Sequence, residues 1–456
     1  MSGRVKGWCP GALRPMESGD GFIIRVRPRQ AALSGAEVAA IAEAARRFGA
    51  GLIDLTNRAN LQIRGIAAQN VAPAQEMLAA AGLLDADAAT EARRNILTAP
   101  DWQEGDDTAR LSAELAARLE ELPDLPAKFG FAIDAGPAPI LTDAPADLRI
   151  ERAAEGLILR ADGREWGCLL PHEGEIDALI RLAHWFAEAR LRGGDARGDD
   201  AATADEHNGA LDHAKDQAPL SAEPNLIRAS TAHPVPPAEQ NAPRHRYAPQ
   251  MPTPQWPDPQ SRRPHSPDQQ SPTPRSPNHR PPTRMARLDA ALPDWAAPRL
   301  PALPPRPAIK PGPGALGLAF GQISADDLAA IGAAGLRVTP WRIILSDAPA
   351  PPALIRDPAN PLLRVDACAG APLCPQATVA THALARALAP HIKGRLHVSG
   401  CAKGCARARP AAVTLTGREG RFDLIQDGLA SDPPSREKLT ETVILHLFRD
   451  PNAPFL

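Results

Sequence analysis

The sequence predicts an α/β (α+β) fold made by tandem duplication, in which two similar halves are joined by a proline-rich linker. A strand–helix–strand pattern occurs once on each side of the linker. Many of the chain's 51 prolines lie in the linker itself, between residues 191 and 305. Only the second half carries two closely spaced cysteine pairs, Cys368-x5-Cys374 and Cys401-x3-Cys405. These observations indicate a repeated architecture with an inorganic centre in one copy.

The first copy of the repeat is predicted within residues 1–90, as an N-terminal segment followed by a half-domain. The run FIIRVRP is typical of a strand, and GLIDLTNRANLQIRG contains a second one. Between them, Ser34-x-x-Glu37 is a capping box that predicts the start of a helix, and Gly49 predicts its end.

The second copy is predicted within residues 306–350, with the same elements in the same order. ALGLAF predicts the first strand, Ser324-x-x-Asp327 opens a helix, and GLRVTPWRIILS predicts the second strand. The two copies are therefore expected to be related by a pseudo-twofold axis, and ligands often bind between such halves.

A larger α/β domain is expected to follow each half-domain, at residues 91–190 and 351–456. The segments RRNILTAP and LPAKFGFAID of the first have the positions of VDACAGAP and IKGRLHVSGC of the second. In both, a hairpin-like strand pair follows, at residues 148–163 and 412–428. The first of these domains lacks cysteine pairs.

Residues 191–305 are predicted to be a disordered linker. The run SRRPHSPDQQSPTPRSPNHR has almost no apolar periodicity, so burial cannot offset the entropy of ordering it.

Composition sets broad limits on function. A hydrophobic content of 43% can build large cores, and a net charge of -2 gives no signal for nucleic acid. The sequence shows no signal peptide and no apolar span of membrane length, so we expect no membrane association and a reducing, cytoplasmic location.

The cysteine quartet predicts a metal centre, because four thiolates are the usual ligand set of an iron–sulfur cluster. Disulfides are disfavoured in a reducing compartment. Zinc stays an alternative, although structural zinc sites prefer two to four residues between paired ligands, which Cys368-x5-Cys374 exceeds. The two remaining cysteines, Cys9 and Cys168, have no partner pair and are interpreted as small packed residues.

The order of these motifs resembles the nitrite and sulfite reductase superfamily. The residues that carry the resemblance are Thr-x-Arg-x-x-Leu-Gln-x-Arg at 56–64, Arg-Asn at 94–95, a Lys-containing strand at 128, and the two cysteine pairs. The resemblance implies a tandem-duplicated fold in which each repeat contributes half of a joint ferredoxin-like domain and one larger α/β domain. It also implies that Cys368, Cys374, Cys401 and Cys405 hold a 4Fe-4S cluster.

Within this superfamily, KGWCPGALRPMESGDGFIIRVRP and LPAKFGFAIDAG resemble the precorrin-3B synthase family of aerobic cobalamin biosynthesis. That resemblance implies a monooxygenase that hydroxylates precorrin-3A at C20 with closure of a γ-lactone. Its partners would be precorrin-3A, dioxygen, and NADH or NADPH acting through an unidentified electron donor. It further implies a mononuclear non-haem iron beside the cluster. No 2-His-1-carboxylate spacing is legible, and His382, His391 and His397 are candidates because they lie near the cysteines.

The basic residues of the first half are the candidate substrate-binding residues. A tetrapyrrole edged with acetates and propionates requires forked, permanently charged donors. Arg58, Arg94 and Lys128 match three cations of the reductases' anion site, while Gly130 stands at the fourth position. That departure favours an organic macrocycle and predicts vacant space beside Gly130. Arg64 and Arg27 are further candidates.

Two alternatives stay open. One is a siroheme-dependent nitrite or sulfite reductase, in which siroheme would be the cofactor. The other is a non-catalytic iron–sulfur electron carrier or a zinc-stapled tetrapyrrole-binding protein.

Overall fold

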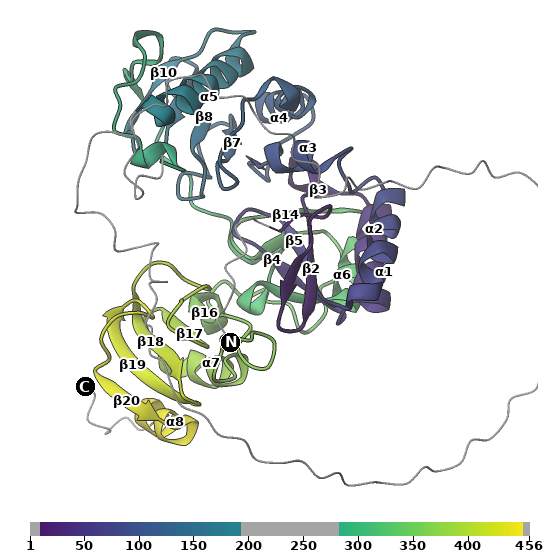
Figure 1. Ribbon diagram of the computed structural model, residues 1–456, viewed down its shortest axis with the longest axis vertical. Helices are drawn as coiled ribbons and strands as arrows, with labels where there is room; N and C mark the ends of the chain where they lie inside the picture. The colour runs from purple at the N-terminus through teal and green to yellow at the C-terminus, as the bar shows by residue number, and fades with distance from the viewer. Residues whose placement is uncertain (1–9, 193–281, 450–456) are drawn as a thin grey trace, which may run out of the picture. The chain divides into compact units, whose positions relative to one another are not determined.

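The computed structural model describes residues 10–192 and 282–449, and the structural statements below concern these residues (Figure 1). The first half-domain contains β1 (Met16–Ser18), β2 (Gly21–Val26), β3 (Ala32–Leu33), α1 (Gly35–Phe48), β4 (Leu52–Leu55), β5 (Leu61–Ile66), α2 (Val71–Ala80) and α3 (Ala88–Arg93). The following α/β domain contains β6 (Ile96–Thr98), α4 (Asp107–Ala117), β7 (Phe131–Asp134), β8 (Leu148–Arg152), β9 (Leu157–Ala161), β10 (Trp166–Leu169) and α5 (Glu175–Arg192).

The second half repeats this order, without counterparts of β1, α2 and α3 among the described residues. After β11 (Leu300–Pro301), its half-domain contains β12 (Ala315–Gly317), β13 (Gln322–Ser324), α6 (Ala325–Gly332), β14 (Leu336–Val338) and β15 (Ile343–Leu345). Its α/β domain contains β16 (Val365–Ala367), α7 (His382–Leu388), β17 (Leu396–Ser399), β18 (Ala411–Arg418), β19 (Arg421–Gly428), β20 (Arg436–Leu439) and α8 (Glu441–Arg449).

Helix α1 begins where its capping signal predicts. The Ser34 hydroxyl accepts a hydrogen bond from the Glu37 amide, and the Glu37 carboxylate accepts one from the Ser34 amide at 2.8 Å. Gly49 follows the helix as its C-terminal cap. The apolar face of α1 is fully buried, with Ile41 at its centre. The corresponding α6 is capped by Ser324, whose hydroxyl accepts from the Asp327 amide at 3.0 Å.

The two half-domains form one joint ferredoxin-like domain by exchanging short strands. Strand β13 of the second half pairs with β4 of the first, and β3 of the first half pairs with β14 of the second. The exchanged strands occupy equivalent places in the two copies, since each directly precedes a capped helix. Helices α1 and α6 pack together, and a single hydrophobic core contains residues of both halves. The predicted duplication is therefore confirmed by the fold.

The two α/β domains have the same sheet topology. In each, three parallel strands are followed by two antiparallel ones, β6-β7-β8-β9-β10 and β16-β17-β18-β19-β20. The registers agree: the Ala99 amide donates to the Ile133 carbonyl, and the Cys368 amide donates to the Val398 carbonyl. Ala99 in the first domain thus stands where Cys368 stands in the second.

The linker ends earlier than predicted. Residues 193–281, most of the expected linker, lie outside the described residues. Residues 282–305, however, form short 3-10 turns and strand β11, which pairs with β10. Met285, Leu288 and Ala296 are buried in the core of the first α/β domain. Three apolar side chains separated by proline and polar residues carry no clear periodicity, which is why composition assigned this stretch to the linker.

None of the helices within the described ranges is long and apolar enough to cross a membrane.

Candidate functional site

The first cysteine pair lies in the turn that follows β16. Cys368 comes directly after the strand, and Gly370 adopts a left-handed conformation with φ of 67°. This turn returns the chain so that the Cys374 amide donates to the Gly370 carbonyl at 2.8 Å. Glycine adopts this left-handed conformation without steric cost, which explains why a glycine stands at this position between the two cysteines.

The second pair follows β17, the neighbouring parallel strand. Because parallel strands end at the same edge of a sheet, the chain enters both cysteine segments side by side. The Ser399 hydroxyl donates to the Cys401 carbonyl at 2.7 Å, and Gly404 has a φ of 61°. A Cβ atom at Gly400 would lie 2.5 Å from that of Ala377, so only glycine lets the two segments approach this closely.

The four thiols are close enough to influence one another. Desolvation by the surrounding atoms raises the pKa of the Cys405 thiol even though the residue as a whole is exposed; Lys403 opposes this shift, and the thiols of Cys401, Cys368 and Cys374 add to it. The Gly400 amide donates to the Cys368 sulfur at 3.1 Å. All four cysteines are free thiols. This arrangement fits a thiolate-ligated iron–sulfur cluster. Such a cluster needs neighbouring thiolates and backbone N–H groups directed at sulfur, and Gly400 lets the two cysteine segments approach each other closely enough to supply them.

A buried carboxylate connects the cysteine segments to the rest of the chain. Asp366, two residues before Cys368, pairs with Arg342, with Arg395 at 3.1 Å and with Arg407 at 3.3 Å. Burial would raise the pKa of Asp366, but Arg342 and Arg395 outweigh it and hold that pKa below its usual range. Sequence reasoning did not identify this ion-pair cluster, because its members come from four separate segments.

The three histidines proposed beside a second metal occupy different environments. His397 is completely buried, and burial lowers its pKa to about 4. His382 stacks on Phe320 with ring centroids 4.5 Å apart, whereas His391 is exposed. Across residues 10–192 and 282–449, no group of three or more His, Cys, Asp or Glu side chains is arranged to hold a single metal ion. The histidine assignment stays a prediction.

Arg58 and Lys128 are brought together, as the motif comparison predicts. Arg58 lies in the loop between β4 and β5, where the Thr56 hydroxyl accepts from its amide at 3.3 Å. Its guanidinium donates to the Lys128 carbonyl at 3.1 Å, and Lys128 is exposed. Gly130 lies beside them.

The predicted vacant space at Gly130 is wrong. A Cβ atom there would lie 3.0 Å from Nη1 of Arg58 and 2.9 Å from Nδ2 of Asn95. The Arg58 guanidinium itself therefore fills the volume next to Gly130. A glycine at this position lets Arg58 approach the strand, and the reductase-like cation would displace it.

Arg64 and Arg94 have carboxylate partners within the protein. Arg64 pairs with Asp20 and with Asp54, both at 2.9 Å, and is 7% exposed. Arg94 forms a fork with both oxygens of Asp85 at 2.8 Å, and is equally buried. A guanidinium engaged in this way has little capacity left for an external carboxylate, so their predicted substrate role gains no support.

Arg27 belongs to the same scaffold as Arg94. Its guanidinium donates to the Glu91 carbonyl, and its own carbonyl accepts from Arg94 at 2.8 Å. Glu91 in turn accepts from the Leu13 amide at 3.0 Å. These bonds tie the N-terminal segment to α3, which is a structural role in place of the predicted substrate-binding one.

Sequence reasoning missed two residues beside Arg58 and Lys128. Arg284 donates to the buried carboxylate of Asp147 at 2.9 Å, and Asp147 also accepts from the Gly130 amide at 3.0 Å. Arg284 lies in the stretch assigned to the linker. The available signal was the spacing of Met285 and Leu288, which are both buried.

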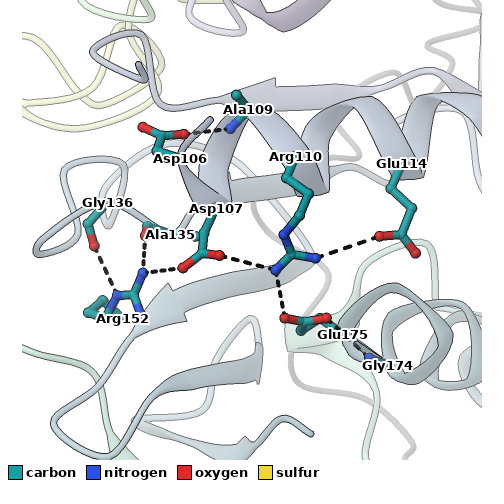
Figure 2. Close-up of polar contacts among 10 residues, drawn as sticks. All are labelled: Asp106, Asp107, Ala109, Arg110, Glu114, Ala135, Gly136, Arg152, Gly174 and Glu175. Atoms are coloured by element: carbon teal, nitrogen blue, oxygen red, sulfur yellow. Dashed lines mark hydrogen bonds and ion pairs between the residues drawn. The ribbon is translucent and has the colours of Figure 1, made fainter. Parts of the chain in front are cut away.

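In the first α/β domain, ion-paired side chains occupy the turn that corresponds to the second cysteine segment of the other domain. By strand register, Gly136 corresponds to Cys401 and Arg152 to Gly417. Figure 2 shows that Arg152 donates to the carbonyls of Ala135 and Gly136 and pairs with Asp107 at 2.7 Å. Asp107 also binds Arg110, which pairs with Glu175 at 2.8 Å. Side-chain ion pairs thus hold a turn that cysteines line in the other half.

The shared ferredoxin-like domain and the repeated α/β domains define a nitrite/sulfite reductase-like fold. Residues 14–81 match the nitrite/sulfite reductase ferredoxin-like half domain. The fold is also similar to the structure of the Mycobacterium tuberculosis NirA protein, with a TM-score of 0.53 and 16% identity, covering 94% of this chain and 80% of that one.

Among individual proteins, the chain resembles precorrin-3B synthase. It is 28% identical over 472 residues to precorrin-3B synthase from Sinorhizobium sp., covering 94% of this chain and 84% of the relative. The resemblance predicted from the sequence motifs is confirmed.

Proposed function

We propose that the protein is an iron–sulfur monooxygenase that converts precorrin-3A to precorrin-3B in cobalamin biosynthesis. The observation that carries the proposal is the grouping of four free thiols after two neighbouring parallel strands of the second half. The resemblance to precorrin-3B synthase along nearly the whole chain supports the choice of reaction. We place the enzyme in the cytoplasm, where reduced nicotinamides are supplied.

Cys368, Cys374, Cys401 and Cys405 would hold a 4Fe-4S cluster, which passes electrons singly. The chain's contribution is to hold these thiolates and to set their surroundings. Arg342, Arg395 and Arg407 surround Asp366 next to the cysteine segments. An excess of positive charge at this place stabilises thiolates and added electrons.

The proposed reaction balances as a monooxygenation. One oxygen atom of dioxygen enters the substrate at C20 as a hydroxyl group, and the other leaves as water. The electron pair comes from NADH or NADPH through a separate donor, and the acetate of ring A closes the γ-lactone. A mononuclear non-haem iron is part of the proposal, with no ligands assigned to it.

Arg58 and Lys128 are proposed to bind carboxylates of the macrocycle. Arg58 places a guanidinium at the backbone carbonyl of Lys128, and Lys128 is itself an exposed basic residue. These positive charges would orient the macrocycle by binding the acetates and propionates at its edge. Arg64, Arg94 and Arg27 are reassigned to the scaffold that supports this site.

The experiment is an anaerobic analysis of iron, sulfide and bound pigment, followed by incubation with precorrin-3A and labelled dioxygen. We expect a brown protein without siroheme, and one labelled oxygen atom in the product. Bound siroheme with reduction of nitrite or sulfite would replace this proposal with the reductase alternative. A colourless zinc protein would exclude both enzymes.

A further inference from the structure

Arg284 reaches the Arg58–Lys128 site from the chain segment that follows the linker. Its guanidinium Nε donates to Oδ1 of Asp147 at 2.9 Å, and the Met285 amide donates to the same oxygen at 2.9 Å. The other oxygen of Asp147 accepts from the Gly130 amide. One completely buried carboxylate thus joins Arg284 to the strand beside Arg58.

Arg284 and Arg58 also share an acceptor. The Lys128 carbonyl accepts from Nη2 of Arg58 at 3.1 Å and lies 3.5 Å from Nη1 of Arg284. Two guanidinium groups therefore meet at the backbone of a third basic residue. Three basic residues, Arg58, Lys128 and Arg284, thus gather at one place, and the Asp147 carboxylate is paired with Arg284 there.

The position of Arg284 is fixed by burial of its neighbours. Met285 and Leu288 pack into the core of the first α/β domain at 4% and 6% exposure, whereas the Arg284 side chain is 23% exposed. The backbone is anchored while the side chain stays partly exposed. Such an arrangement suits a binding residue, because little conformational freedom is lost when a ligand arrives.

We propose that Arg284 is a third basic residue of the carboxylate-binding site, held in place by Asp147 and the Lys128 carbonyl. It would bind an acetate or propionate of a tetrapyrrole. This inference rests on the proposed function of the site and extends it to a residue outside the duplicated motifs.

The test measures binding of uroporphyrin, a porphyrin with acetate and propionate side chains, to the full chain by fluorescence titration. We expect Arg284→Ala to weaken binding about tenfold, as loss of one charge-assisted hydrogen bond predicts. Arg284→Lys should lose less, because the charge stays and only the fork is removed. The loss should shrink at high salt, where exposed charges are screened.

Arg287→Ala is the matched control, because Arg287 is an exposed arginine in the same turn. Its affinity should equal that of the wild type. Arg284→Gln, which keeps hydrogen-bond donors without charge, replaces the alanine variant should the latter fail to fold. In the double variant with Arg58→Ala, the combined loss should differ from the sum of the single losses, since both arginines share one acceptor.

Two results would overturn the inference in distinguishable ways. Wild-type affinity in both Arg284→Ala and Arg284→Gln, with weaker binding in Arg58→Ala, removes Arg284 from the site and leaves the proposed function intact. Failure of the wild-type protein to bind uroporphyrin overturns both.

Discussion

Asp366 and Arg407 form an ion pair that links the two cysteine segments. Asp366 precedes Cys368 by two residues, Arg407 follows Cys405 by two, and their charged atoms are 3.3 Å apart. The pair therefore fixes the start of one segment against the end of the other. Arg395, which directly precedes β17, also pairs with Asp366, so β17 is held at the same carboxylate.

Asp366→Asn should lower the cluster content of the purified protein. The substitution leaves three arginines without their shared anion, and we expect the free energy of unfolding to fall by about 2 to 3 kcal/mol, allowing for solvent screening of the partly exposed arginines. Iron and sulfide per chain, together with a urea titration, measure both effects. Asp423→Asn is the control. It breaks the pair between the buried Asp423 and the exposed Arg418 in the same sheet, so it should lower stability while the metal content stays unchanged.

The cysteine quartet should behave as one unit. Cys401→Ser or Cys405→Ser exchanges a soft thiolate for a poorly ionised hydroxyl, so the cluster should be lost or degraded. Absorbance in the visible range and sulfide analysis report this. Cys168→Ser should keep the brown colour, because Cys168 is buried in the other α/β domain. An intact 4Fe-4S spectrum in Cys405→Ser would remove Cys405 from the ligand set.

Substitution of Arg94 should lower stability, whereas substitution of Arg58 should weaken porphyrin binding. Arg94→Ala leaves the buried carboxylate of Asp85 with only a long pair to the exposed Arg29, at 3.8 Å, and should lower the free energy of unfolding by about 3 kcal/mol. The neighbouring Arg93→Ala removes only a weak pair with the fully exposed Asp124, and should change stability by less than about 0.5 kcal/mol. Arg58→Ala should weaken porphyrin binding about tenfold with little change in stability. Unchanged porphyrin affinity in Arg58→Ala would move the binding site elsewhere.

Asp134 should make stability depend on pH in an identifiable way. Its side chain is fully buried, one oxygen has no hydrogen-bond partner among the residues that the structure describes, and burial raises its pKa to about 6. The folded state therefore holds this proton more tightly than the unfolded state. The group lowers stability as pH rises from about 4 to about 6, by roughly 3 kcal/mol in all.

Asp134→Asn removes this titration. The difference in unfolding free energy between variant and wild type should shift in favour of the variant between pH 4.5 and pH 7. Urea titrations at several pH values measure it. A constant difference across that range would contradict the raised pKa.

The linker should be divisible into a dispensable part and a required part. Replacing residues 196–279 by a shorter flexible chain that still spans the gap should keep cluster content and porphyrin binding. Extending the deletion through Ala296 removes Arg284 and three buried apolar side chains, and should cost more than about 3 kcal/mol of stability. Thermal melting of both variants distinguishes them. Equal stability would show that residues 282–296 are not part of the core.

The features that could be predicted from the sequence depend on short chain distances. The Ser34–Glu37 capping box, the cysteine spacing and the repeated strand–helix–strand order each lie within a few dozen residues. The pairing of Arg64 with Asp20 spans 44 positions, and that of Arg284 with Asp147 spans 137. A basic residue at a motif position looks the same whether its partner is a substrate or a distant aspartate.

The Gly130 interpretation failed for a related reason. An absent side chain indicates empty space only when no other side chain occupies it, and here the Arg58 guanidinium lies in that volume. The motif therefore identified the correct neighbours and the wrong cavity. Packing around a glycine cannot be read without the side chains that face it.

The exchange of β3 and β13 between the half-domains has a consequence for how the protein folds. Each half-domain lacks one strand of its own sheet, so neither can complete its hydrogen bonds or its core before the other is present. The covalent connection then acts as a tether that raises the effective concentration of one half near the other. A chain cut within residues 196–279 should therefore reassemble from its two pieces when they are produced together, and each piece alone should aggregate through its unpaired strand edges.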